Sequence, residues 1–72
     1  MTTGGNFPVS DLQYNVITTL SNLLQGMESL AKYQQDATKN GDEQLAQTFG
    51  AIHDSYREGA VKLRDELARL AK

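Results

Sequence analysis

Lys39-Asn40-Gly41-Asp42 separates two long segments that both have a helical pattern. Lys39 suits the negative C-terminal end of a first helix, and Gly41 can adopt the left-handed conformation that ends a helix. Asp42 can then accept a hydrogen bond from the first backbone N–H groups of a second helix. We therefore expect a helix over about residues 11–39, a turn at 40–42 and a second helix over about 43–71.

Apolar residues on both sides of this turn recur at steps of three and four, which is typical of helices and not of strands. Before the turn these residues are Leu12, Val16, Ile17, Leu20, Leu23, Leu24, Met27, Leu30 and Ala31. After the turn we expect one seam of Leu45, Phe49, Ile52, Tyr56, Gly59, Leu63, Leu67 and Leu70. Two equal helices joined by so short a turn predict an all-α antiparallel hairpin, in which opposite residues have numbers that sum to about 82.

The first helix has a well-defined predicted start, since Ser10 and Gln13 have the spacing of a capping box. Val9 and Tyr14 have the spacing of a hydrophobic staple over that cap. Residues 1–9 have no periodicity and predict a flexible tail. The tail lacks the basic region and apolar run of a secretory signal, and no stretch is long and apolar enough to span a bilayer. We therefore expect a cytoplasmic protein that does not bind membranes.

The composition of the 72 residues limits the classes of function. A net charge of −2, from seven basic and nine acidic residues, gives no basic surface for nucleic acid. The absence of cysteine excludes disulfides, thiolate metal sites and cysteine nucleophiles within this chain. The glycines inside the helical pattern are isolated and do not form a phosphate-binding loop. We therefore expect no enzyme activity.

The apolar arc of the first helix is too wide for one partner helix to cover. It spans about 140° of the helix circumference, from Leu12 on one edge to Ile17 and Leu24 on the other. A chain this short also has little core of its own. We therefore predict that two hairpins pair into a four-helix bundle, as a homodimer or a higher oligomer.

The first helix carries no charge between Asp11 and Glu28. An uncharged polar face of this kind is typical of a contact surface, although an ordinary neutral face is the alternative. A protein partner can therefore bind through this face or through the tail that contains Phe7.

His53 is the single histidine, and together with Glu28 it is the candidate metal ligand. On a helical wheel, His53 lies about 70° from the centre of the expected seam and near the level of Glu28. A symmetric dimer would bring two copies of each side chain together, which is a suitable ligand set for zinc or iron. The alternative is a flank histidine that is solvated or bonded to a polar neighbour.

Tyr56 lies near the centre of the expected seam, with Gly26 opposite it and Gly59 one turn later. Each internal glycine costs about 1 kcal/mol relative to alanine, so we interpret both glycines as making room for the Tyr56 ring. A cavity for ligand entry is the alternative. Gln34 is a second polar residue that we expect to face inward. Polar residues in a helix–helix seam typically set the register of the two helices.

Four stretches of the chain resemble the small ferritin-like proteins, namely Leu24-Gln25-Gly26-Met27-Glu28, Tyr33-Gln34-Gln35-Asp36-Ala37, Asn40-Gly41-Asp42-Glu43-Gln44-Leu45 and the spaced Arg57, Ala60, Leu63 and Leu67. Those proteins are single hairpins, similar to half of a ferritin or rubrerythrin bundle, that dimerise to complete it. Metal-binding members carry an inward carboxylate on the first helix and a Glu-x-x-His pair on the second. The matching positions here are Gly26, Tyr56 and Gly59. The resemblance, which covers residues 12–71, therefore implies the fold without the ferroxidase activity.

Two main functions remain open from the sequence. The first is a non-enzymatic, oligomeric helical-bundle protein with a binding or scaffolding role and no cofactor. The alternative is a ferritin-like protein that binds iron or zinc through Glu28 and His53 at a dimer interface. A secreted helical-hairpin substrate is a third possibility, which has less support because the chain lacks the Trp-x-Gly turn of such proteins.

Overall fold

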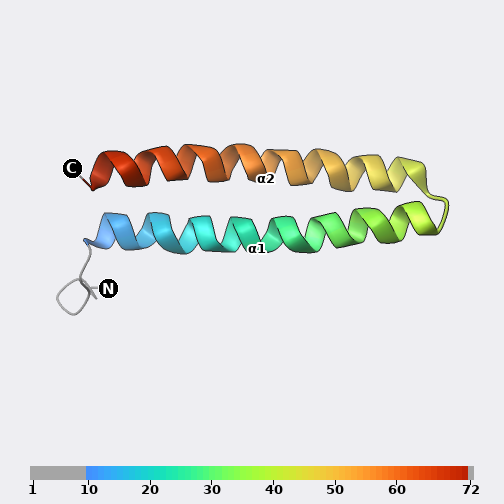
Figure 1. Ribbon diagram of the computed structural model, residues 1–72, viewed down its shortest axis with the longest axis horizontal. Coiled ribbons are helices and arrows are strands. Elements are labelled where there is room, and N and C mark those ends of the chain that lie inside the picture. Colours follow the sequence, from blue (N-terminus) through green and yellow to red (C-terminus); the bar gives the residue numbers. More distant parts are fainter. Residues whose placement is uncertain (1–9, 72) are drawn as a thin grey trace.

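The structure contains two antiparallel α-helices joined by a short turn (Figure 1). The computed structural model describes residues 10–71, so the predicted tail at 1–9, and with it the staple that needs Val9, lies outside the described residues. Helix α1 spans Asp11–Lys39 and helix α2 spans Glu43–Leu70. Over the described residues the fold is therefore an all-α hairpin.

Both helices begin at the polar caps that the sequence predicts. At the start of α1, the Gln13 N–H donates to Ser10 Oγ at 3.1 Å, and the Ser10 N–H donates to Gln13 Oε1 at 3.1 Å. These two bonds confirm the capping box. At the start of α2, the Leu45 N–H donates to Asp42 Oδ1 at 3.0 Å. At the start of each helix, a polar side chain from the neighbouring sequence therefore accepts a hydrogen bond from a backbone N–H group that has no partner within the helix.

Gly41 closes the turn with a φ of 78°, a conformation that strains any residue with a side chain. No side chain of another residue lies near the place a Cβ would occupy, so a substitution adds backbone strain without a clash. We expect Gly41→Ala to lower the free energy of unfolding by about 1 kcal/mol, and Gly41→Asn by less, because asparagine tolerates this conformation. Urea denaturation followed by circular dichroism measures both, and equal losses for the two variants would contradict the explanation from strain.

The two helices lie side by side along their whole length (Figure 1), in the register that the sequence predicts. The rings of Tyr33 and Phe49 are 5.7 Å apart, and Gly26 packs against the ring of Tyr56. In both pairs the residue numbers sum to 82. The equal lengths of the two predicted helices were therefore enough to predict which residues of α1 lie opposite which residues of α2.

The contact between the helices follows a seven-residue repeat. Inward positions alternate steps of three and four in each helix, and all of them are buried or half-buried: Gln13, Val16, Leu20, Leu23, Met27, Leu30, Gln34 and Ala37 in α1, and Ala46, Phe49, His53, Tyr56, Ala60, Leu63, Leu67 and Leu70 in α2. We call these sixteen residues the seam. A seven-residue repeat of this kind is typical of coiled-coil packing, in which helices wrap around each other with a left-handed twist.

The α2 half of the seam differs from the prediction. Leu45 and Ile52 were predicted on the seam, but both side chains are exposed, whereas Ala46 and Ala60 are buried. The α2 half of the seam combines Ala46 and Ala60, which let the two helices approach closely, with larger side chains at the positions between them. The prediction was wrong here because it chose Leu45 and Ile52, the larger apolar residues one position before the inward ones. The same shift moves His53 from a flank position onto the seam.

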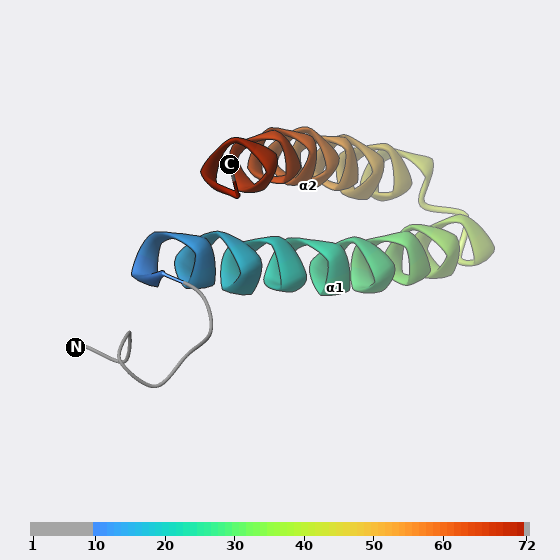
Figure 2. The same cartoon turned by 60° about the vertical axis from the view of Figure 1, so that its left-hand side comes forward.

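The hairpin has almost no interior of its own. Among residues 10–71, the buried residues are Ala37, Ala46 and Ala60. The molecule measures 51 × 20 × 14 Å, which is the thickness of one layer of helices. Figure 2 shows the same single layer from a second direction, with neither broad face covered by another element of the described chain. Large apolar side chains therefore remain accessible on both faces.

Candidate functional site

The candidate functional surface consists of the apolar side chains that border the seam on its two sides. Leu12 on one side is 63% exposed, and Ile17 and Leu24 on the other side are 41% and 50% exposed. The single partner helix therefore does not cover the apolar arc of α1, as the width of that arc predicts.

The leucine flank, on one side of the seam, consists of Ile17, Leu24 and Val61. Leu24 and Val61 border an open groove, together with Leu20, Met27, Arg57, Ala60 and Arg64. A neighbouring depression on α1 contains Ile17 and extends to Glu28. This flank is therefore apolar along its centre and carries charges of both signs at its edge.

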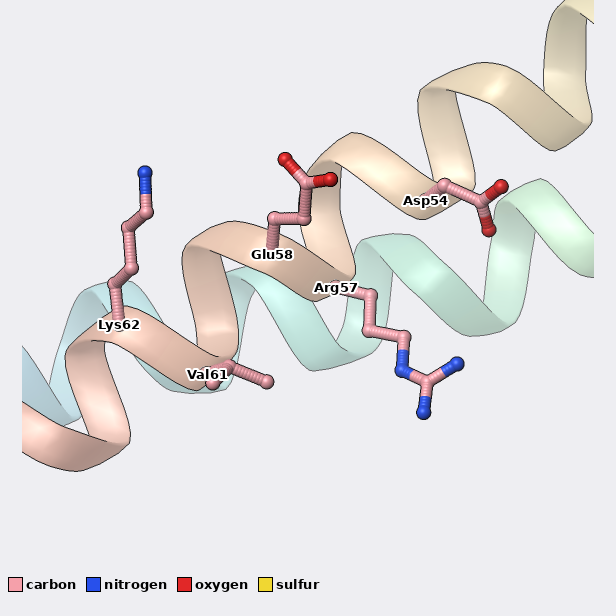
Figure 3. Close-up of a pocket in the computed structure, with 5 residues that line it drawn as sticks. All are labelled: Asp54, Arg57, Glu58, Val61 and Lys62. Carbon is pink, nitrogen blue, oxygen red and sulfur yellow. The ribbon is translucent and has the colours of Figure 1, made fainter.

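A shallow depression on the outer side of α2 adjoins the leucine flank and shares Arg57 and Val61 with it. Its volume is about 520 Å³, and its lining residues are Asp54, Arg57, Glu58, Val61 and Lys62. Figure 3 shows Arg57 and Val61 extending from one side of α2, and Glu58 and Lys62 from the other. All five residues are exposed to water, so the depression does not enclose a carboxylate for acid–base chemistry.

The tyrosine flank, on the opposite side of the seam, consists of Tyr33, Leu45 and Ile52. The ring of Tyr33 is tilted by 52° against the ring of Phe49. A depression beside these rings contains the carboxylates of Asp36 and Asp42 and is lined by no basic residue. This flank is therefore aromatic and acidic at the end of the hairpin that carries the turn.

The two candidate metal ligands occupy different environments. Glu28 is exposed on α1, whereas the His53 side chain is 29% exposed on the seam, with Nδ1 lying 3.6 Å from Asp54 Oδ1. That separation is too long for a hydrogen bond. No group of three or more His, Cys, Asp or Glu residues is placed to hold a metal ion within residues 10–71. A metal site built from Glu28 and His53 would therefore need ligands from a second copy, and it stays a prediction.

The positions that match the iron ligands of ferritin-like proteins do not fit an iron site. The Tyr56 ring occupies the space beside Gly26, where a Cβ would lie only 2.6 Å from Tyr56 Cε2. Gly59 packs against a different residue, since a Cβ there would lie 3.3 Å from Leu23 Cδ1. The interpretation that Gly26 makes room for Tyr56 is therefore confirmed, whereas the same interpretation of Gly59 is wrong. These positions offer neither the carboxylates nor the imidazole that iron would need.

Sequence reasoning missed three features of this surface. Gly50 makes room for Gln34, whose Nε2 would lie 2.7 Å from a Cβ at Gly50. The sequence reasoning also missed the contribution of Val61 and Arg57 to this surface. A single valine among charged residues is a weak signal of an apolar surface. The hairpin register places Val61 level with Ser21, between Ile17 and Leu24, and could have found it.

The chain matches no protein-family model, and comparisons with curated proteins and with solved structures find no significant match either. Neither helix has a segment, within residues 10–71, that is long and apolar enough to cross a bilayer. The function of the protein is therefore inferred from its own residues and their geometry.

Proposed function

We propose that this chain is a non-enzymatic helical-bundle protein with a binding or scaffolding role, in which two hairpins associate into a four-helix bundle of the ferritin-like type. One observation carries the proposal. Over residues 10–71 the buried residues are three alanines, while large apolar side chains are exposed on both flanks. Burial of apolar surface is the main favourable term in folding, so a second copy would supply the interior that one copy lacks.

The dimensions of the hairpin support this proposal. Each broad face is 51 Å long and 20 Å wide. Its projected area of about 1,000 Å² exceeds the roughly 800 Å² per partner that a stable interface of standard size buries. One face of the hairpin is therefore large enough to hold two copies together.

The chemistry of the described residues supports a non-enzymatic role. No polar or charged residue among them is buried, and the depressions on the surface are open. Catalytic groups act most strongly in enclosed, water-poor sites, where their charges are less screened. The exposed flanks are better suited to contacts with a protein surface than to chemistry on a small substrate.

Native mass spectrometry of the untagged protein, combined with sedimentation equilibrium, tests the proposal. We expect a metal-free species of twice the 7.9 kDa chain mass, which dissociates and loses helicity together on dilution. A folded single chain that melts cooperatively at micromolar concentration would contradict self-association. Bound iron or zinc in a fixed ratio, lost in His53→Ala, would instead support the metal-binding alternative.

A further inference from the structure

We infer that two copies pair through their leucine flanks, with α1 of each copy against α2 of its partner and both turns at the same end of the bundle. This inference rests on the proposed self-association and adds to it the contact surface and the orientation. It follows from the charges that border each flank and from the levels at which residues lie along the hairpin.

The charges favour the leucine flank over the tyrosine flank. The leucine flank is bordered by Glu28 on α1 and by Asp54, Arg57 and Arg64 on α2, so two copies can bring opposite charges together. The depression on the tyrosine flank contains Asp36 and Asp42 without a basic residue, so two copies paired there with both turns at the same end would bring carboxylates together. Like charges across an interface are unfavourable, which favours the leucine flank for this orientation.

The apolar residues of the leucine flank fit one another when α1 of one copy lies against α2 of the other with both turns at the same end. A twofold axis along the bundle keeps each residue at its own level. Val61 is level with Ser21, because their numbers sum to the 82 of the hairpin register. The partner's Val61 would therefore lie between Ile17 and Leu24, about one helical turn from each, as a knob between two ridges.

The same orientation places opposite charges within reach of each other. Arg57 is level with Gln25, three residues before Glu28, which is about 4.5 Å along the helix axis. Within residues 10–71, neither Glu28 nor Arg57 has an ion-pair partner in its own chain. The long Arg57 side chain can therefore reach the partner's Glu28, and it lies one turn from Asp54 of its own chain, which is level with that Glu28. Arg57 can thus lie between the two carboxylates, and the symmetry makes this arrangement twice.

The opposite orientation, with the turns at opposite ends, is disfavoured by Arg57. The midpoint of α2 lies between Tyr56 and Arg57, because the helix spans Glu43–Leu70. A twofold axis through the middle of the hairpin would then place Arg57 beside the partner's Arg57. That contact brings the two arginines together beside Asp54 of each copy, whereas the inferred orientation places each arginine near a carboxylate of the partner, Glu28.

Charge reversal tests the predicted contact between Arg57 and the partner's Glu28. We expect Arg57→Glu alone and Glu28→Arg alone to raise the dimer dissociation constant about tenfold each at low salt, because each places like charges opposite one another. The double variant is expected to return to within about threefold of the original protein. Lys62→Glu and Asp36→Arg are matched controls, since they make the same charge changes at exposed positions off the leucine flank.

The outcomes of this experiment separate the inference from the proposed function. Rescue in the double variant supports the inference. Additive weakening, or single variants that behave like their controls, overturns the inference while the original protein remains dimeric. A monomeric original protein overturns the proposed function itself.

Spin-label distances test the orientation, and the chain has no cysteine of its own to interfere with labelling. Gln44→Cys introduces a label at an exposed position near the turn. Double electron–electron resonance on the labelled dimer is expected to give a distance of about 20–30 Å if both turns share one end, against about 40 Å or more if they lie at opposite ends. A distance in the longer range overturns the inferred orientation.

Discussion

Leu24→Glu is expected to raise the dissociation constant of the proposed dimer at least about 100-fold, which corresponds to about 2.7 kcal/mol. Leu24 is half exposed in a single hairpin, and the proposed pairing would bury it in both copies. Full burial of an exposed leucine contributes about 1.5–3 kcal/mol, so burial of the exposed half contributes about half of that in each copy and about 1.5–3 kcal/mol in the dimer. Burial of the new carboxylate would add a further cost. Sedimentation equilibrium over a range of concentrations measures the change directly.

Two further variants control for charge and for the choice of flank. Asn22→Glu adds the same charge two residues away, at an exposed position outside the leucine flank, and is expected to change the dissociation constant little. Ile52→Glu adds it to the tyrosine flank and is expected to leave the dimer intact. A dimer that Ile52→Glu dissociates and Leu24→Glu does not would place the interface on the tyrosine flank instead.

Gly26→Val is expected to lower the free energy of unfolding by about 2–3 kcal/mol at fixed chain concentration. A Cβ at this position would lie 2.6 Å from Tyr56 Cε2 and 3.0 Å from Cδ2, so the ring has to move, and the two added methyl groups increase the displacement. Valine is a better helix former than glycine by a few tenths of a kcal/mol, which offsets only a small part of this cost. Urea denaturation followed by circular dichroism gives the difference.

A double-mutant cycle with Tyr56 isolates the contact. In a Tyr56→Ala background the ring is absent, so Gly26→Val is expected to cost much less than in the original protein. Ser29→Val serves as the matched control, because Ser29 is exposed on the same helix and reports the effect of valine without the ring. Equal costs of Gly26→Val in both backgrounds would show that the ring does not limit the size of residue 26.

The parts of the fold that could be predicted from the sequence depend on local chemistry. The caps and the turn each depend on residues only a few positions apart, namely Ser10 with Gln13, Gly41 and Asp42. Each of these local structures requires a particular residue type, so the residue type indicates the structure. Tyr56 and Gly26 are far apart in the sequence, yet their contact followed from the equal lengths of the helices on either side of the turn. Local signals and length were sufficient for the hairpin and its register.

The inner edge of α2 could not be predicted in the same way. The sequence pattern contains two overlapping apolar stripes, one through Leu45 and Ile52 and one through Ala46 and Ala60. Hydrophobicity favours the first stripe, but the distance between two packed helices favours the second, and that distance is a property of the pair. His53 was placed off the seam for the same reason, and its half-buried position follows from the second stripe.

The candidate site could be predicted only in outline. The width of the apolar arc on α1 indicated that a single helix would not cover it, and the exposure of Leu24 agrees. The contribution of α2, through Arg57 and Val61, depends on which face of α2 turns toward the seam. The face of α2 that packs against α1 could not be predicted from the sequence pattern.

The seven-residue repeat of the seam also constrains how the length of this hairpin can change. One residue inserted in the middle of α1 would rotate everything beyond it by about 100° and turn the inward side chains toward water. Removing one whole repeat from each helix at matching levels, for example residues 17–23 with 59–65, would keep every remaining inward position inward. Natural insertions and deletions in such a chain should therefore occur as matched pairs of seven residues, or fall within the turn.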